Sequence, residues 1–262
     1  MTRPWLGMIP AACLALCAQA GPLALPAPPD MAFAPVPGRQ VPLDLVFRDD
    51  DGAPARLRDL SADRPVILVP GYYHCANLCS TVMDGVLESL AQARLPRGAW
   101  RVVGFSIDSG ETASVAAAKK QSYGALVAAS GGNLHMLTGD AAAIGALMQA
   151  IGLRASRVAG SGEIAHPAGF VVLTTDGRIV QAFSGVRFDA PALRHAIEQA
   201  RAGKVGSLTQ QWLMRCVHFD PRTGRYTVTI LDGIRALFLG AFATLAGWWL
   251  WHRLWHKRRR PS

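Results

Sequence analysis

The chain has 262 residues, half of them hydrophobic, and a formal net charge of +9. This length accommodates one substantial domain with appendages, and the hydrophobic share indicates apolar segments outside a single core. No basic patch with interleaved aromatic residues occurs in the sequence, which excludes nucleic acid as a predicted partner. Much of the positive excess lies at the two ends of the chain, in Arg3, Arg253, Lys257, Arg258, Arg259 and Arg260.

Residues 1–20 are predicted to be a secretory signal peptide. Arg3 precedes a mostly apolar stretch, and the A-x-A motif at 18–20 is typical of a cleavage site. One alternative is an uncleaved anchor, for which the segment is short. Another is lipid modification of Cys13 or Cys17, whose neighbouring residues do not fit a lipoprotein signal.

Residues 21–38 are rich in Pro and Ala and are predicted to form an extended linker. A domain is predicted over 39–203, where strand-like and helix-like apolar patterns alternate. In chain order the predicted elements are a hairpin with arms at 41–47 and 54–60, a strand at 65–69, a helix from the cysteines to about 90, a strand at 100–107, a helix over 112–129, a strand at 134–137, a helix over 141–151, a loop over 154–165, a hairpin with arms at 170–174 and 179–183, and a helix over 192–202. Asp140 and Asp189 are predicted to cap the helices that follow them, an Asp-Gly turn at 176–177 is predicted in the second hairpin, and a further turn is predicted over 218–226.

This order of elements predicts an α/β fold. Parallel strands joined by helices, followed by an antiparallel hairpin and a helix, are typical of a thioredoxin-like sandwich. Here the sandwich would carry an N-terminal hairpin and one inserted unit of a strand and a helix.

Residues 234–255 are predicted to form a transmembrane helix. The run 236–251 contains no charged residue, and a belt of Trp residues lies beside the basic tail, residues 256–262. The positive-inside rule places this tail in the cytoplasm and the domain outside, as the signal peptide also requires. The alternative is a buried core helix, but the basic cluster would be hard to place in one.

A juxtamembrane segment, residues 204–233, is predicted between the domain and the membrane helix. It contains Cys216, the odd cysteine of the mature chain. The expected role of Cys216 is that of a buried apolar residue, and the alternative is a resolving or intermolecular thiol near the membrane.

Cys75 and Cys79 lie where the strand at 65–69 turns into the following helix. In the first turn of a helix, residues four apart share a face, and the unpaired backbone N–H groups there stabilise a thiolate. The pattern therefore predicts redox exchange, binding of a soft metal ion, or both. The alternative is a structural disulfide or two cysteines of the core.

His166 is predicted to be the third ligand of a metal site with Cys75 and Cys79. Copper(I) favours thiolates and accepts an imidazole. His166 directly precedes the strand at 170–174, whose start lies beside the cysteine turn in a thioredoxin-like sheet. A loop residue is the alternative for His166, while His74 is expected to point away from the site. Structural or exposed positions are expected for His135, His195 and His218.

Three stretches resemble the Sco/SenC family of membrane-anchored copper chaperones for cytochrome c oxidase assembly. They are G-Y-Y-H-C-A-N-L-C at 71–79, F-S-I-D at 105–108, and the segment from His166 to Ile179. The resemblance covers roughly 40–203. The stretch from Cys216 to Tyr226 and the tail helix also look like a bacterial branch with a C-terminal anchor.

The resemblance implies that Cys75, Cys79 and His166 bind a copper ion and that Asp108 supports the site. It implies delivery of copper to the copper-site subunit of cytochrome c oxidase, with another periplasmic copper chaperone or a thiol reductase as a further partner. It also implies a single-pass protein of the bacterial inner membrane whose domain faces the periplasm.

The chain departs from the family pattern at several positions. Ala76 and Ser80 follow the two cysteines, and Ser109 follows Asp108, where the family usually has Pro. Pro167 follows His166 and resembles the cis-proline that faces the cysteine pair of thiol oxidoreductases. The alternative function is therefore a membrane-anchored thiol–disulfide oxidoreductase that acts on cysteines of the oxidase subunit. Both functions can coexist, because copper(I) requires reduced thiols, so whether the protein is an enzyme stays open at this point.

Overall fold

The computed structural model describes residues 31–74, 78–158 and 163–205, together with shorter stretches at 219–220, 225–226, 237–242, 244–245, 247–249 and 251–252. The predicted signal peptide, most of the predicted linker, Cys75, Cys216 and the basic tail lie outside the described residues.

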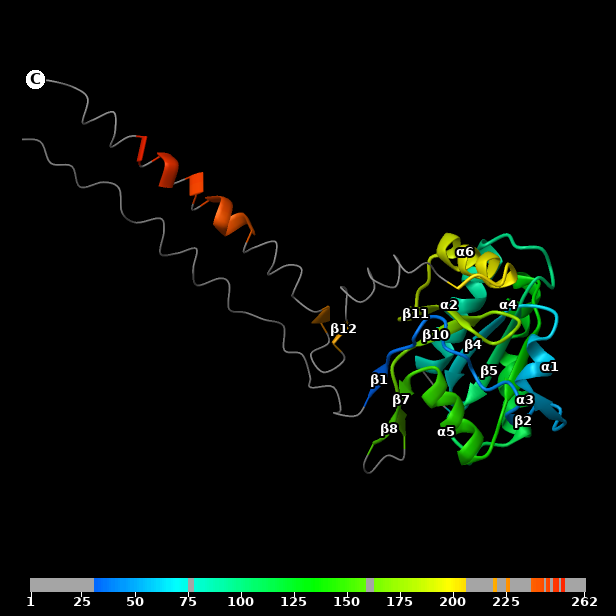
Figure 1. Ribbon diagram of the computed structural model, residues 1–262. Helices are drawn as coiled ribbons and strands as arrows, with labels where there is room; N and C mark the ends of the chain where they lie inside the picture. Colours follow the sequence, from blue (N-terminus) through cyan, green and yellow to red (C-terminus); the bar gives the residue numbers. More distant parts are fainter. Residues whose placement is uncertain are drawn as a thin grey trace, which may run out of the picture.

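A five-stranded sheet with the order β11-β10-β4-β5-β6 forms the centre of the domain (Figure 1). The three strands β4, β5 and β6 are parallel, whereas β10 runs antiparallel to both β4 and β11. The strands are β4 (Val66–Gly71), β5 (Arg101–Ser106), β6 (Leu134–Leu137), β10 (Gly169–Leu173) and β11 (Ile179–Ser184). All five lie where the sequence predicts strands, and the fold is the predicted α/β thioredoxin-like sandwich.

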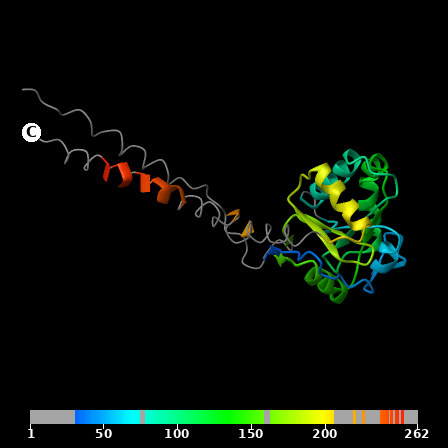
Figure 2. The same ribbon diagram turned by 45° about the horizontal axis from the view of Figure 1, so that its top comes forward.

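Each face of the sheet supports its own core, because successive residues of a strand point to opposite faces. On one face, Ile67 and Val69 of β4 belong to a cluster with buried residues of α2 (Leu78–Gln92) and α6 (Ala190–Arg201). The helix α6, yellow in Figure 2, lies against β10 and β11. Its side-chain cap is the predicted one, with Asp189 accepting a hydrogen bond from the Ala192 N–H.

On the other face, Val66 and Leu68 of β4 pack in a second cluster with residues of α5 (Ala141–Ala150). The predicted cap of α5 is confirmed, because the Asp140 side chain accepts a hydrogen bond from the Ala143 N–H. The β4 strand is therefore apolar on both sides, which explains its continuous apolar sequence.

Three local predictions differ from the structure. The hairpin of β2 (Val46–Arg48) and β3 (Pro54–Arg56) is present, but its second arm ends early and continues as α1 (Leu57–Ser61). Leu57 and Leu60 are both buried, and their spacing of three residues places them on one face of a helix, whereas a strand would place them on opposite faces.

The helix predicted over 112–129 is two helices, α3 (Ala113–Ser122) and α4 (Gly124–Ser130). They are separated at Tyr123, whose backbone leaves the helical conformation and whose ring is buried in the core. The loop predicted over 154–165 contains a small hairpin of β8 (Ser156–Arg157) and β9 (Ile164–Ala165), anchored by the buried Ile164.

The described end of the predicted linker packs on the domain. In Figure 1, β1 (Ala32–Phe33) lies beside β7 (Leu153–Arg154), with which it pairs in antiparallel register. The backbone N–H of Gly38 also donates to the Ile179 carbonyl at 2.7 Å. The Pro-rich composition predicted an extended linker and did not indicate these contacts, because a strand pairing of only two residues produces no recognisable sequence pattern.

The C-terminal region is described only in part. A two-residue pairing of β12 (Phe219–Asp220) with β13 (Arg225–Tyr226) brackets the turn predicted there. Among the described residues, no helix has the length and apolar character needed to cross a membrane. The described parts of the predicted span 234–255 are short helical stretches with exposed Leu237, Phe238 and Trp248. The membrane helix therefore stays a prediction.

Candidate functional site

The two predicted cysteines belong to the turn that joins β4 to α2. The described helix begins at Leu78, so Cys79 lies in its first turn, where backbone N–H groups have no partner within the helix. Cys75 and the side chain of Cys79 lie outside the described residues. Ser80 directly follows Cys79, and its Oγ accepts a hydrogen bond from Nζ of Lys119, in α3, at 2.7 Å. A positive charge thus lies close to the helix start, a setting that favours a thiolate.

His166 lies at the same edge of the sheet, although it is far from the cysteines in the sequence. It lies between β9 and β10, and β10 pairs antiparallel with β4, with Val171 opposite Leu68. The start of β10 therefore lies at the edge where β4 ends. The ring of His166 packs edge-on against the ring of Tyr72, with 6.4 Å between the ring centroids. The predicted position of His166, near the chain that leads into Cys75, agrees with this arrangement.

The environment of His166 favours a neutral imidazole. The residue is buried, and burial lowers the pKa of its ring, an effect that exceeds the opposing hydrogen bond to the backbone of Pro167. Nδ1 donates to the Pro167 carbonyl at 3.0 Å, so Nε2 carries the lone pair. The bond between His166 and Pro167 is trans, so the cis-proline expected from thiol oxidoreductases has no counterpart at this position.

Asp108, the predicted supporting residue, lies just after the end of β5. Its Oδ1 accepts hydrogen bonds at 3.1 Å from the backbone N–H of Gly110 and from Nη2 of Arg157. Arg157 belongs to β8, so this ion pair joins the end of β5 to the hairpin that leads into His166. Asp108 thus contacts the hairpin that precedes His166.

Glu111 is a buried carboxylate that the sequence reasoning missed. It accepts hydrogen bonds from the backbone N–H groups of Tyr73 and His74, from the ring of His74, and from the hydroxyl of Ser106. Tyr73 and His74 are the last two described residues before Cys75. The available signal was the acidic residue three positions after Asp108, in the segment after β5.

The remaining described histidines have other partners. His135 Nδ1 contacts Asp49 Oδ2 at 2.6 Å, and His195 Nε2 contacts the amide of Gln199 at 2.9 Å. Asp49, Asp50 and His135 form a group close enough to hold a metal ion. However, Lys120 Nζ contacts both carboxylate oxygens of Asp50, at 2.8 and 2.9 Å, and supplies a positive charge there.

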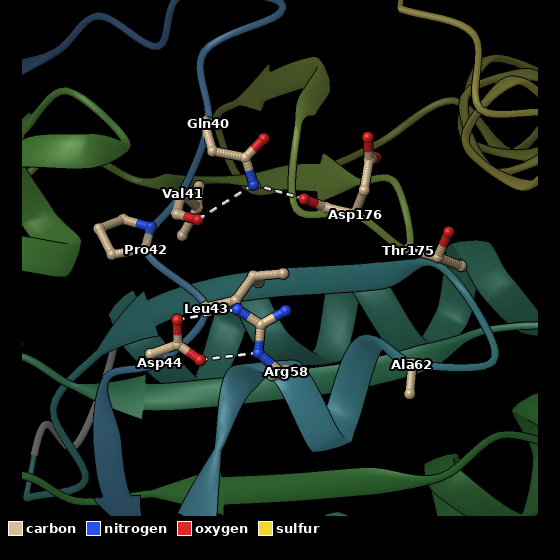
Figure 3. Close-up of a pocket in the computed structure, with 9 residues that line it drawn as sticks. All are labelled: Gln40, Val41, Pro42, Leu43, Asp44, Arg58, Ala62, Thr175 and Asp176. Atoms are coloured by element: carbon tan, nitrogen blue, oxygen red, sulfur yellow. Dashed lines mark hydrogen bonds and ion pairs between the residues drawn. The ribbon is translucent and has the colours of Figure 1, made fainter.

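A pocket lies at the opposite edge of the sheet (Figure 3). Its lining includes Leu43, Ala62, just before β4, and Thr175, after the end of β10. Figure 3 shows the Asp44 carboxylate and the Arg58 guanidinium paired at one side of this pocket. The pocket is therefore separate from the edge that carries His166.

The family comparison matches the domain just described. The model of the SCO1/SenC family matches residues 40–201, which is more than half of the chain. No curated protein sequence matches the chain at a significant level.

Solved structures share the fold. An electron transfer protein from Aquifex aeolicus VF5 is 25% identical, covers 64% of this chain and 96% of its own, and has a TM-score of 0.56. Arabidopsis thaliana ScoI, solved with copper bound, is 14% identical with a TM-score of 0.51, covering 66% of this chain and 99% of its own. BsSco, described as a member of the Sco family of cytochrome c oxidase assembly proteins with a disulfide switch, has 16% identity, the same coverages and the same TM-score. With its sheet, its cysteine turn and its family match in agreement, the chain belongs to the SCO1/SenC family.

Proposed function

We propose that the protein is a copper-binding chaperone that assists assembly of the copper site of cytochrome c oxidase, with Cys75, Cys79 and His166 as its copper ligands. The observation that carries the proposal is the position of His166. Its buried, neutral imidazole lies at the sheet edge where β4 runs into the cysteine turn, against the ring of Tyr72.

The donor set suits a soft monovalent ion. Two thiolates and one imidazole give a three-coordinate site for copper(I), and a neutral imidazole can bind without first losing a proton. The positive charge of Lys119 near the start of α2 favours ionised thiols in that turn. Copper is the cargo of this protein, and its recipient would be the copper-site subunit of the oxidase.

The test is copper(I) competition against a chelator for the wild type, Cys75→Ala, Cys79→Ala and His166→Ala, with oxidase activity measured in the same strains. Loss of either thiolate removes a strong soft ligand, so binding should collapse. Loss of the imidazole should leave a two-sulfur site that binds more weakly and no longer supports oxidase assembly.

The matched control is His195→Ala, because His195 lies on the exposed side of α6 and contacts Gln199. This variant should behave like the wild type in both assays. If His166→Ala also behaves like the wild type in both, the ligand role of His166 fails.

In that case the second candidate, a thiol–disulfide oxidoreductase, takes its place. Cys79 in the first turn of a helix of a thioredoxin-like fold favours this chemistry. The reduced pair would pass two electrons and two protons to a disulfide of the oxidase subunit and would itself become a disulfide. Such exchange needs no imidazole ligand, so His166→Ala should leave it largely intact.

We also propose that the chain is anchored in the bacterial inner membrane by residues 234–255, with the domain in the periplasm and the tail in the cytoplasm. The Trp belt and the basic tail support this orientation. Protease added to intact spheroplasts should digest the domain and leave a C-terminal tag protected. A tag that is cut while the domain survives would reverse the orientation.

A further inference from the structure

We propose that Glu111 is a positioning residue for the cysteine turn. Its carboxylate fixes the two residues that precede Cys75 and thereby sets the shape of the turn in which the cysteine pair works. The inference extends the proposed function, on which it rests where copper is concerned.

The carboxylate of Glu111 accepts hydrogen bonds from the backbone of the turn. The Tyr73 N–H donates to both carboxylate oxygens, at 2.7 and 2.8 Å, and the His74 N–H donates to Oε1 at 2.8 Å. The side chain of Glu111 is 1% exposed, so these charge-assisted hydrogen bonds are shielded from water. A change in this carboxylate therefore reaches the chain immediately before Cys75.

The same carboxylate also holds a side chain of the turn. Nδ1 of His74 lies 2.7 Å from Oε1, although the His74 side chain is 66% exposed. A carboxylate that accepts the Nδ1–H of an imidazole fixes the tautomer and the orientation of the ring. Glu111 thus restrains both the backbone and the ring of the residue next to Cys75.

Glu111 is itself held in place by the end of β5. The hydroxyl of Ser106 donates to Oε2 at 2.6 Å and accepts the N–H of Asp108 at 3.0 Å. On the far side, Tyr73 is fixed by its hydroxyl, which donates to the Leu137 carbonyl at 2.6 Å. The carboxylate is therefore a rigid link between the core strands and the turn, across 38 residues of sequence.

Position matters here because a metal site or a thiol pair tolerates little displacement. Ligands need supporting groups that hold them within about half an ångström of a working geometry. Outer partners of metal sites typically change metal affinity by about 10- to 100-fold when they are removed. Tyr73 and His74 directly precede Cys75 in the chain, and Glu111 accepts the backbone N–H groups of both.

The experiment compares Glu111→Ala with Glu111→Gln. Gln keeps the carbonyl oxygen at the Oε1 position for the N–H groups of Tyr73 and His74. Its amide replaces Oε2, so Gln removes the charge, the second contact of the Tyr73 N–H and the hydrogen bond from Ser106. Ala removes the Oε1 contacts as well. The matched control is Ser89→Ala, which deletes a partly buried hydrogen bond from α2 to the Phe188 carbonyl, at 2.8 Å and away from the turn.

Three measurements are made on the full chain: copper(I) affinity by chelator competition, the equilibrium of the cysteine pair with glutathione, and hydrogen exchange of the Tyr73 and His74 amides. For Glu111→Ala we expect at least a tenfold loss of copper affinity, an equilibrium constant with glutathione changed by more than threefold, and fast exchange of both amides. Glu111→Gln, which keeps the Oε1 contacts, should lose clearly less than Glu111→Ala in each measurement, and Ser89→Ala should lower stability without changing either site property.

Two outcomes would overturn the proposal. One is a Glu111→Ala protein with wild-type copper affinity and a wild-type glutathione equilibrium, which would leave Glu111 a merely structural residue. The other is Glu111→Gln losing as much as Glu111→Ala, which would show that the Oε1 contacts with Tyr73 and His74 do not position the turn. If the wild type itself binds no copper, the proposed function fails, but the glutathione equilibrium and the amide exchange still decide the role of Glu111.

Discussion

A carboxylate is buried at the edge of the sheet where β4 ends and β10 begins, whereas the carboxylate paired with Arg58 at the opposite edge is exposed. At the first edge, Ser106, Glu111 and His166 are all less than 9% exposed. At the opposite edge, around the pocket of Figure 3, the Arg58 and Asp44 side chains are 57% and 75% exposed. Both edges close the same sheet, so the sheet itself does not require the difference.

Burying a polar group costs free energy unless hydrogen bonds replace its water. At the first edge that cost is offset by dense hydrogen bonding, in which one carboxylate serves three residues. A buried carboxylate with this many hydrogen bonds is more expected near a functional site than at an ordinary strand end. The buried carboxylate thus distinguishes the first edge from the opposite one independently of the family match.

The largest effect on stability is expected from Glu111→Ala. The substitution leaves the N–H groups of Tyr73 and His74 without their acceptor, and each unsatisfied buried donor costs about 1–3 kcal/mol. We expect the free energy of unfolding to fall by about 2–4 kcal/mol, measured by urea denaturation. A loss below about 1 kcal/mol would mean that water enters the turn and satisfies these groups, and the contrast between the edges would weaken.

A smaller effect on stability is expected from Asp49→Asn, which tests the partly buried pair of Asp49 and His135. Partial burial alone would raise the pKa of Asp49, but the hydrogen bond with His135, helped by the Asp50 N–H, outweighs it and lowers the pKa to about 2. Because the folded-state pKa lies below the unfolded one, the contribution is present above pH ~4 and is lost as the pH falls towards 2.

We therefore expect Asp49→Asn to lower the free energy of unfolding by about 1 kcal/mol at pH 7, after allowance for solvent screening. The difference from the wild type should shrink in thermal unfolding as the pH is lowered from 4 to 2. The control is Asp51→Asn, which keeps an oxygen for the Ala53 N–H and should match the wild type. A difference that is constant with pH would show that the charge of Asp49 is not the cause.

The strands and caps of the domain were predictable because local patterns specify them. The apolar run of β4 indicates a buried strand, and the Asp-Gly pair before β11 indicates a hairpin turn. Gly177 in that turn has a positive φ of 82°, which glycine adopts readily. Asp140 and Asp189 cap the helices that they precede, as expected. In these places local preference and tertiary packing agree.

The misread elements are those in which tertiary contacts decide. The spacing of Leu57 and Leu60 suits one face of a helix, but the five residues of α1 are too few for a clear helical pattern. Both leucines pack in the second core. The β8–β9 hairpin rests on one buried residue, Ile164, which a loop reading had no reason to single out.

The position of His166 was predictable from topology, because the start of β10 must lie beside the end of β4 in this sheet order. Glu111 was not predictable in this way. Its partners are backbone N–H groups 37 and 38 residues away, and backbone groups leave no mark on the sequence. The ligand roles of Cys75, Cys79 and His166 stay predictions.

A still smaller effect on stability is expected from His166→Leu, although the site should lose its imidazole. A buried imidazole replaced by an apolar side chain of similar volume gives up the hydrogen bond from Nδ1 to the Pro167 carbonyl and gains apolar burial. The free energy of unfolding should therefore change by less than about 1 kcal/mol in urea, while copper(I) affinity falls. A loss of stability as large as that of Glu111→Ala would make His166 a structural residue. The two buried residues could then no longer be separated into one that stabilises the edge and one that binds copper.

The smallest effect is expected from Arg58→Ala, at the edge opposite the site. Its guanidinium pairs with the Asp44 carboxylate at 2.7 and 2.8 Å, a bidentate geometry that also lowers the pKa of Asp44. Both side chains are largely exposed, however, so water and salt screen the pair and ordering two long side chains opposes it. The urea midpoint should match that of the wild type within error, in both low and high salt, and copper(I) affinity should not change. A clear loss of stability in low salt that disappears in high salt would show that this exposed pair does hold the sheet edge, and burial would then no longer separate the two edges.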